Sequence, residues 1–181
     1  MSKKDNEKLI DFTDENSPVN AAKDFAHRAH SGQKYGHKPF TKHLQDTVLV
    51  LKEFGYELDH DLIASAWLHD VVEDTDVLIE QVYSEFGKRV GDLVDAVTDG
   101  PGKTREEKKQ RPYRLIPEIP GAIVLKLADR IANVRHTIAD QQPTAGRYYE
   151  TYKREHAGFS IALGKKGEAK EMWCVLDNLL T

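Results

Sequence analysis

The chain has 181 residues, which is enough for one domain with a substantial buried core. Its 26 Lys and Arg residues against 30 Asp and Glu residues give a net charge of −4, and this acidic excess argues against a dedicated nucleic-acid binder. A single cysteine, Cys174, excludes a disulfide scaffold, and its apolar neighbours predict a position in the core.

The N-terminal segment and the hydropathy of the chain indicate where in the cell the protein is expected. Residues 1–16 are polar, and this charged segment contains no apolar core of the kind found in a signal peptide. No apolar run approaches the roughly 20 residues that a membrane-spanning helix needs. We therefore expect a cytoplasmic protein with no membrane partner, made of a polar segment over residues 1–16 and one domain over residues 17–181.

The first predicted elements are a helix and a loop. Ser17 followed by Pro18 is typical of an N-cap and a first helical position, and predicts a helix from Val19 to about Ala29. Residues 31–42 contain glycine, proline and several basic side chains, which favours a loop. Such a loop either binds a phosphate or is a solvated turn, and both interpretations stay open.

Hydrophobic residues at helical spacing predict the next helices. One begins at His43 and ends at Gly55, and Asp59 is predicted to cap the helix that follows. Asp76 is predicted to cap a further helix, which Gly87 ends. No alternating pattern typical of strands occurs in the chain, so the predicted fold is all-α.

Residues 99–120 interrupt this helical pattern. Glycines and prolines punctuate the segment, which follows a helix predicted over residues 90–97. The Gly-Lys-Thr sequence at 102–104 resembles part of a phosphate-binding loop, but the complete motif needs a preceding strand and glycine where Val97 stands. A nucleoside-triphosphate fold is therefore rejected. The basic run over residues 105–114 forms either a solvated face or one wall of a phosphate site.

The helix that starts near Pro120 carries two separate faces. Its polar stripe is Lys126, Asp129 and Asn133, so Asp129 forms either a surface ion pair or a carboxylate ligand to a metal. Its apolar face, predicted to pack in the core, consists of Ile123, Leu127, Ile131, Val134 and Ile138. Two last helices, over about 144–163 and 168–180, carry aromatic residues that are also predicted to lie in the core: Tyr148, Tyr149, Tyr152, Phe159 and Trp173.

The stretch over residues 66–75 joins an apolar run to a His-Asp pair and a Glu-Asp pair. On one continuous helix His69 lies above Glu73, and Asp70 lies above Asp74, beside an apolar stripe. A buried carboxylate needs a counter-charge, and imidazole nitrogen and carboxylate oxygen are both good metal ligands. An isolated His-Asp pair usually forms surface hydrogen bonds, but four such groups so close together favour a divalent metal site.

A wider set of motifs resembles a known family. The order His43, then His69-Asp70, then Asp129 resembles the H…HD…D signature of metal-dependent phosphohydrolases of the HD superfamily. More narrowly, the chain resembles the hydrolase domain of RelA/SpoT homologues and the stand-alone small alarmone hydrolases of the Mesh type. HDVVEDT and KLADR-x-x-N are the most specific blocks, and the matching segments are residues 30–33, 38–43, 67–75, 86–87, 93–98 and 126–135.

The resemblance implies a compact, multi-helix HD-domain fold and roles for particular residues. It assigns one Mn²⁺ ion to four ligands, His43, His69, Asp70 and Asp129. It implies that Glu73 and Asp74 position and activate the attacking water, and that Asn133 contacts the nucleotide sugar and phosphate. So highly charged a substrate also needs cations, and the substrate-binding candidates are Lys34, Lys38, Lys126, Arg130, Asn133 and Tyr152.

The implied reaction removes the 3′-pyrophosphate from guanosine tetra- or pentaphosphate, a small-molecule nucleotide, and releases GDP or GTP. Two departures from the family pattern affect the choice of base. Lys34-Tyr35 stands where the family usually has an Arg-Lys pair in a loop one residue longer, and Leu44 replaces a common proline. An adenosine alarmone such as ppApp is therefore a second candidate substrate.

Two other functions stay open. A phosphatase of the same fold, acting for instance on the 2′-phosphate of NADPH, would release inorganic phosphate instead of pyrophosphate. A non-catalytic helical domain that senses a nucleotide is the third hypothesis, although the presence of every expected ligand and of the Glu-Asp pair counts against it. The sequence is compatible with a monomer or a homodimer.

Overall fold

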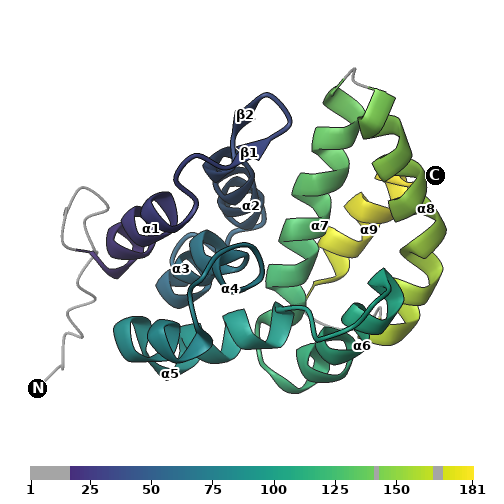
Figure 1. Cartoon of the computed structure of the whole chain (residues 1–181). Helices are drawn as coiled ribbons and strands as arrows, with labels where there is room; N and C mark the ends of the chain where they lie inside the picture. Colours follow the sequence, from purple (N-terminus) through teal and green to yellow (C-terminus); the bar gives the residue numbers. More distant parts are fainter. Residues whose placement is uncertain (1–16, 141–142, 165–168) are drawn as a thin grey trace, which may run out of the picture.

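The computed structural model describes residues 17–140, 143–164 and 169–181, so the predicted polar segment over residues 1–16 lies outside the described residues. The regular elements of the described residues are helices apart from one short hairpin, which confirms the predicted all-α fold. The elements are α1 (Pro18–Ala29), β1 (Lys34–Tyr35), β2 (Lys38–Pro39), α2 (Thr41–Glu53), α3 (His60–Leu68), α4 (Val71–Asp74), α5 (Ile79–Val97), α6 (Arg105–Leu115), η1 (Ile116–Glu118), α7 (Ala122–Ala139), α8 (Pro143–Leu163) and α9 (Lys170–Leu179) (Figure 1).

Two early helices begin at their predicted caps. The Ser17 hydroxyl accepts a hydrogen bond from the backbone N–H of Asn20 at 3.2 Å, and Pro18 is the first residue of α1. The Asp59 carboxylate accepts one from the N–H of Leu62 at 3.1 Å, at the start of α3. These side chains satisfy N–H groups that have no partner within the helix. Both predicted N-caps are therefore confirmed.

The helix that was expected to run through the His-Asp and Glu-Asp pairs is interrupted. α3 ends at Leu68 and α4 begins at Val71, so the prediction of one continuous helix is wrong. Nδ1 of His69 lies 2.9 Å from the Ala66 carbonyl oxygen, the acceptor that the next backbone N–H would use in a longer helix. The break lets the side chains of His69 and Asp70 reach residues on α2 and α7.

Gly87 bends α5 at the position where the sequence predicts a helix end. Its φ of 83° and ψ of 176° belong to a region that is essentially restricted to glycine. The start of the helix differs from the prediction, because α5 begins at Ile79 and not after Asp76. There the Gln81 side chain accepts a hydrogen bond from the N–H of Leu78 at 2.8 Å, which fixes the helix start two residues later.

Residues 99–120 contain a helix that the sequence pattern does not predict. α6 begins after a capping box, in which the Thr104 hydroxyl accepts a hydrogen bond from the N–H of Glu107 at 3.1 Å. The Glu107 carboxylate in turn accepts one from the N–H of Thr104 at 3.2 Å. Most of the side chains of α6 are polar, so this helix lacks the hydrophobic period that predicts the others.

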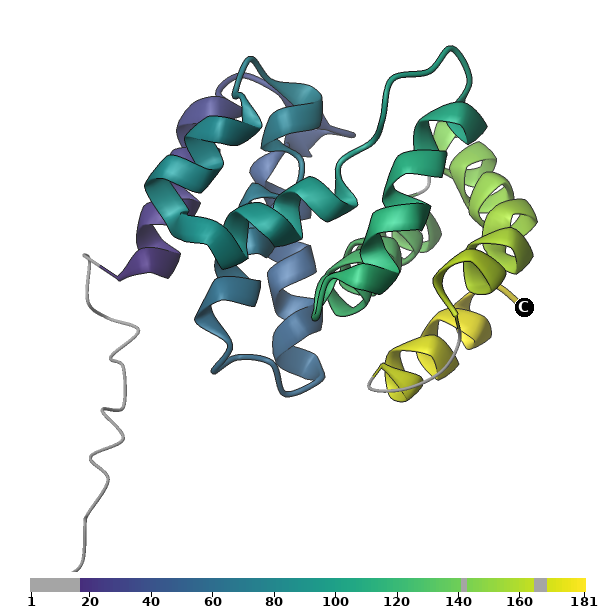
Figure 2. The ribbon, with the colours of Figure 1, turned by 90° about the horizontal axis from the view of Figure 1, so that it is seen from below.

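α7 lies between the two halves of the molecule. It packs against α2, α3 and α5 on one side and against α8 and α9 on the other (Figures 1 and 2). Leu127, Ile131 and Val134 of its predicted apolar face are buried. Ile138, in the last turn of α7, is 55% exposed, so its predicted place in the core is wrong; in that turn the helix buries Thr137 instead.

Two other residues that were predicted to lie in the core are exposed. Cys174 faces solvent because α9 buries the opposite side, which carries Met172 and Trp173. Tyr148 is 59% exposed on α8, whereas Phe159 and Trp173 are buried, with their ring centroids 5.5 Å apart. The contact between α8 and α9 therefore uses only part of the aromatic set.

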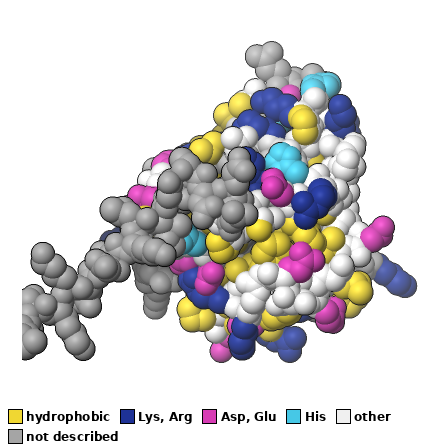
Figure 3. Space-filling model, turned by 90° about the vertical axis from the view of Figure 1, so that its left-hand side faces the viewer, with side chains coloured by type: hydrophobic (Ala, Val, Ile, Leu, Met, Phe, Trp, Pro, Cys, Tyr) yellow, Lys and Arg dark blue, Asp and Glu magenta, His cyan; other side chains and the backbone are white. Residues whose placement is uncertain are grey.

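One face of the molecule carries a mixture of side-chain types. On the face shown in Figure 3, Lys and Arg side chains are interspersed with Asp and Glu side chains around a central group of hydrophobic side chains. None of the helices in the described part of the chain is both long enough and apolar enough to cross a membrane.

Candidate metal centre and active site

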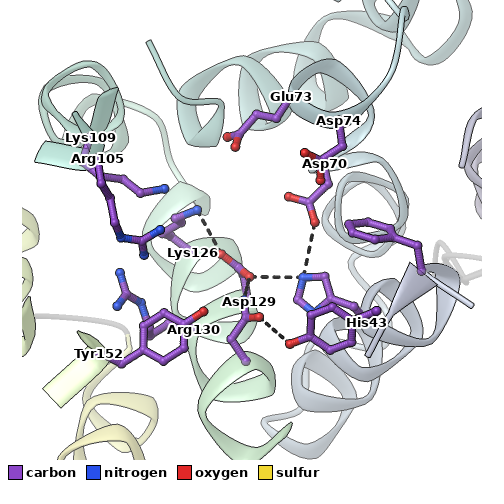
Figure 4. A pocket seen from close by; sticks show the side chains of 13 residues that line it. His43, Asp70, Glu73, Asp74, Arg105, Lys109, Lys126, Asp129, Arg130 and Tyr152 are labelled. Carbon is purple, nitrogen blue, oxygen red and sulfur yellow. Dashed lines mark hydrogen bonds and ion pairs between the residues drawn. The ribbon is translucent and has the colours of Figure 1, made fainter. Parts of the chain in front are cut away.

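The four predicted metal ligands come together from three parts of the chain. His43 lies in the first turn of α2, His69 and Asp70 lie between α3 and α4, and Asp129 lies in α7. Nε2 of His43 is 3.3 Å from both Asp70 Oδ2 and Asp129 Oδ1 (Figure 4). The same atom is 3.2 Å from Nε2 of His69. Nε2 of His69 is 3.2 Å from Asp70 Oδ2 and 3.7 Å from Asp129 Oδ1. The same two nitrogen atoms thus face both carboxylates.

The burial and the chemistry of this cluster fit a divalent metal ion. His43 is 3% exposed, His69 is 1% exposed and Asp129 is 7% exposed, and one donor atom from each lies within 4.8 Å of the other two. Nδ1 of His69 is engaged with the Ala66 carbonyl, which directs Nε2 of that ring toward the cluster. Imidazole nitrogen and carboxylate oxygen together suit a divalent transition metal.

Asp129 is held from two sides by groups on its own helix. Lys126 places Nζ 2.9 Å from Oδ2, and the amide nitrogen of Asn133 donates a hydrogen bond to Oδ1 at 2.5 Å. Burial alone would raise the pKa of Asp129, but the Lys126 ammonium and the neighbouring imidazoles hold that pKa well below its usual range. The carboxylate therefore stays ionised, as a metal ligand must.

Glu73 and Asp74 lie on α4 at the edge of the cluster. Glu73 Oε1 accepts a hydrogen bond from the backbone N–H of Asp99 at 2.6 Å. Both side chains reach solvent, yet partial burial raises the pKa of the Glu73 carboxyl and that of the Asp74 carboxyl, and the Asp70 charge adds to both shifts. A carboxylate with a raised pKa is a better proton acceptor than an ordinary one.

A cavity of about 190 Å³ opens over the metal-ligand cluster. Figure 4 shows Glu73 and Asp74 on one side of this cavity and cationic side chains on the other. Carboxylates that face cations across a space of this size can hold a water molecule on one side and phosphate oxygens on the other. The cationic wall consists of Lys126 and Arg130 from α7 and Arg105 and Lys109 from α6.

The cationic wall is anchored by neighbouring acidic and aromatic groups. Arg130 is 4% exposed, its guanidinium lies 4.7 Å from the centre of the Tyr152 ring, and Nη1 lies 3.3 Å from the carboxylate of Glu155. Glu155 also binds Arg105, with 2.7 Å between Oε1 and Nε. Lys109 places Nζ 2.8 Å from Oδ1 of Asp99, which lies just after α5. Burial lowers the pKa of Lys109, and the nearby Lys126 ammonium lowers it further.

The predicted substrate-binding residues divide into two groups. Lys126, Arg130, Asn133 and Tyr152 line the cavity, as a substrate site requires. Lys34 and Lys38 lie on the β1–β2 hairpin with exposed side chains and are not among the lining residues. They remain predictions for the part of a substrate that extends beyond the cavity.

Four other lining residues were not named individually from the sequence, namely Tyr35, Phe40, Arg105 and Lys109, although the last two belong to the basic run that was left open as one wall of a phosphate site. A signal for two of them was present, because Thr104-x-x-Glu107 is a capping-box pattern. A helix that starts there places positions 105 and 109 one turn apart on the same face. Tyr35 and Phe40 carry no such signal, since the hairpin that places them has strands of only two residues.

Comparison with known proteins is consistent with this geometry. A family model described as HD domain matches residues 22–114, which is more than half of the chain and includes His43, His69 and Asp70. A guanosine-3′,5′-bis(diphosphate) 3′-pyrophosphohydrolase of Aquifex aeolicus is 37% identical over 137 residues, which is 72% of this chain and 19% of that protein. The human protein named guanosine-3′,5′-bis(diphosphate) 3′-pyrophosphohydrolase MESH1 is 35% identical over 118 residues, which is 63% of this chain and 66% of that protein.

The chain thus spans about a fifth of the length of the Aquifex relative and just under two thirds of the human one. A solved structure, described as a metazoan ortholog of SpoT that hydrolyzes ppGpp and plays a role in starvation responses, matches with a TM-score of 0.73 at 24% identity. That match covers 90% of this chain and 93% of the other, so the two proteins share their fold. From the family match and the converging histidine and aspartate side chains, we conclude that the chain belongs to the HD domain family.

Proposed function

We propose that this chain is a metal-dependent hydrolase that removes the 3′-pyrophosphate of an alarmone nucleotide, with Mn²⁺ as its metal. One observation carries the proposal: His43, Asp70 and Asp129 of the ligand cluster line the same cavity as the Glu73–Asp74 pair and four cations, and His69 lies directly behind them. The similarity to proteins named ppGpp 3′-pyrophosphohydrolases supports the reaction class. The proposed hydrolase domain spans residues 17–181, because α8 supplies Tyr152 to the cavity and α9 packs against α7.

His43, His69, Asp70 and Asp129 would hold the metal. When bound, this ion supplies positive charge that lowers the pKa of water and polarises phosphoryl oxygens. The residues of the chain then have separate tasks. Lys126 keeps Asp129 ionised, and the backbone N–H of Asp99 holds the Glu73 carboxylate in place.

Glu73 and Asp74 orient the attacking water and accept its proton. The water oxygen forms a bond to the phosphorus atom attached to the ribose 3′ oxygen, and the bond from that phosphorus to the 3′ oxygen breaks. The 3′ oxygen leaves with the electron pair of that bond and takes up a proton from solvent, so the products are pyrophosphate and a nucleotide with a free 3′ hydroxyl. The cations of α6 and α7 offset negative charge on the pyrophosphate oxygens.

The size of the cavity favours a particular pose. At about 190 Å³ it is smaller than the roughly 300 to 1,000 Å³ that is typical of sites enclosing a whole drug-sized ligand. It therefore encloses the phosphate part of the substrate, and the nucleoside extends toward the hairpin, where Lys34 and Lys38 are exposed. Guanosine and adenosine alarmones both remain candidates on this basis.

The proposal predicts pyrophosphate release from ppGpp or ppApp incubated with the protein and Mn²⁺, followed by anion-exchange chromatography. His69→Ala and Asp129→Ala should each lower the rate at least about a hundredfold, because each removes a metal ligand. Asp92→Ala is a matched control, since Asp92 pairs with Lys88 on α5 and does not line the cavity.

Three other outcomes would contradict the proposal. Release of inorganic phosphate from NADPH, with both alarmones left intact, would select a phosphatase. Tight binding of a nucleotide without turnover would select the sensor hypothesis. Full activity in the Asp129→Ala variant would show that the ligand cluster is not the reaction site.

A further inference from the structure

The β1–β2 hairpin brings Tyr35 to the cavity. Tyr35 pairs with Lys38 in the antiparallel register, so Gly36 and His37 form a two-residue turn. Gly36 has φ 61° at the first turn position, where a tight hairpin of this kind requires glycine. The turn is short and the register is fixed, so the Tyr35 side chain has a defined place among the residues that line the cavity.

The Tyr35 ring is packed, and its hydroxyl is engaged. The ring centroid lies 5.0 Å from that of His43 and 4.2 Å from that of His136. The hydroxyl donates a hydrogen bond to Asn133 Oδ1 at 2.6 Å. Burial raises the pKa of the phenol, and the nearby Tyr152 and Asp129 raise it further, so the hydroxyl keeps the proton that it donates.

The side-chain amide of Asn133 links Tyr35 to the proposed metal ligand Asp129 through two hydrogen bonds. Its Oδ1 accepts the hydrogen bond from Tyr35, and its Nδ2 donates one to Asp129 Oδ1 at 2.5 Å. An amide whose oxygen is engaged in this way has one orientation only, with its nitrogen toward Asp129. Asp129 Oδ1 is also the atom that lies 3.3 Å from Nε2 of His43, and Lys126 binds the other carboxylate oxygen.

We propose that Tyr35 is a positioning residue for the metal site, which orients Asp129 through the Asn133 amide. The inference rests on the proposed metal-dependent function. Hydrogen-bond partners behind a metal ligand typically change metal affinity by about 10- to 100-fold when they are removed. Tyr35 acts in this way from a hairpin that contributes no ligand itself.

Tyr35→Phe is the sharpest test, because it keeps the ring packing on His43 and His136 and removes only the hydroxyl. We expect isothermal titration of Mn²⁺ into the metal-free full chain to give an affinity about tenfold or more below that of the unmodified chain. Asn133→Ala should weaken Mn²⁺ binding to a similar degree. The double variant should lose little more than either single variant, because both substitutions break the same chain of contacts.

Tyr83→Phe is the matched control. Tyr83 also donates its hydroxyl to an aspartate, Asp92 Oδ1 at 3.0 Å, but on α5 and outside the cavity. This variant should bind Mn²⁺ like the unmodified chain. Thermal unfolding without metal should give similar midpoints for both phenylalanine variants, which separates a positioning effect from a loss of folding.

Each remaining outcome would overturn the inference in a recognisable way. Unchanged Mn²⁺ affinity in Tyr35→Phe would show that the hydroxyl does not position the ligand. If the affinity were unchanged and only the KM for the nucleotide rose, Tyr35 would be a substrate contact instead. Additive losses in the double variant would separate Tyr35 from Asn133. If the unmodified chain itself failed to bind Mn²⁺, the proposed metal-dependent function would fail first.

Discussion

The position of Glu73 favours proton transfer, but the ionised side chain lowers the stability of the folded state there. Burial raises its pKa above the ordinary value of 4.5, so the folded state binds this proton more tightly than the unfolded chain does. Stability therefore falls as the pH rises from 4.5 through the raised pKa of the folded state. At neutral pH the ionised side chain lowers the stability of the fold, although the reaction needs it as a base.

Glu73→Gln should consequently lower activity and raise stability. Glutamine keeps an oxygen that can accept the hydrogen bond from Asp99 N–H but cannot accept the proton of the water, so we expect at least about a hundredfold loss of pyrophosphate release. The melting temperature at pH 7 should rise, and the gain should disappear as the pH falls below the ordinary pKa. Thermal unfolding at several pH values and a rate measurement check both effects.

Glu85→Gln serves as the control for this charge removal, because Glu85 is exposed on α5 and does not line the cavity. It should leave the rate of pyrophosphate release unchanged. A lower melting temperature of Glu73→Gln at pH 7 would contradict the assigned direction of the pKa shift. An unchanged rate would remove Glu73 from the reaction.

The individual site residues were predictable to different degrees. His69, Asp70 and Asp129 stand beside apolar helical stripes, where a carboxylate or imidazole is unexpected without a function. Arg105 and Tyr35 stand in polar segments, where a cation or a tyrosine is ordinary. They line the cavity because a short hairpin and a polar helix pack beside it. The local sequence pattern does not predict this packing.

The helices that carry a capping residue or an apolar period were predictable, as α7, α8 and α9 show, whereas the polar helix α6 was not. α1 and α3 begin at their predicted caps because a single side chain supplies the missing acceptor. The break after α3 depends on the His69 ring and the Ala66 carbonyl, a contact that the spacing of apolar residues does not reveal. α6 is polar on most sides, so its capping box was the one available indication.

The bend at Gly87 leads to a prediction about α5. An L side chain in this conformation is strained, so Gly87→Ala should lower the free energy of unfolding by about 1 to 3 kcal/mol. Gly158 is the matched control, since it lies inside α8 without a positive φ and has open space where a Cβ would stand. Gly158→Ala should raise stability by about 0.4 to 1 kcal/mol.

Urea unfolding of both glycine variants measures the two effects. Opposite signs are expected because the first substitution strains the folded backbone and the second restricts mainly the unfolded chain. A Gly87→Ala variant as stable as the unmodified chain would mean that α5 straightens there without cost. In that case the bend would not be needed for packing α5 against α3 and α7.

The residues of the candidate active site come from both sides of α7, so neither side alone contains a complete site. α2 and the segment after α3 supply His43, His69 and Asp70, whereas α6 and α8 supply cations and Tyr152. α7 lies between them and supplies Asp129, Lys126 and Arg130. A ligand bound in the cavity therefore bridges elements far apart in sequence, and it binds the folded chain in preference to the unfolded one.

This arrangement predicts that Mn²⁺ stabilises the whole fold. At a free concentration 100 times Kd, binding to the native state adds about 2.7 kcal/mol, which corresponds to a rise in melting temperature of roughly 5 to 10 °C for a chain of this size. A chelator should reverse the rise.

Two histidine variants test whether the ion binds at the cluster. His69→Ala should abolish the rise in melting temperature by removing a ligand. His27→Ala should keep it, because His27 is exposed on α1 and packs near the Trp67 ring, outside the cavity. Differential scanning calorimetry with and without Mn²⁺ measures these effects in the unmodified chain and in both variants. A shift that survives in His69→Ala would place the ion elsewhere on the surface, and the two halves of the molecule would then not be joined through the cluster on α7.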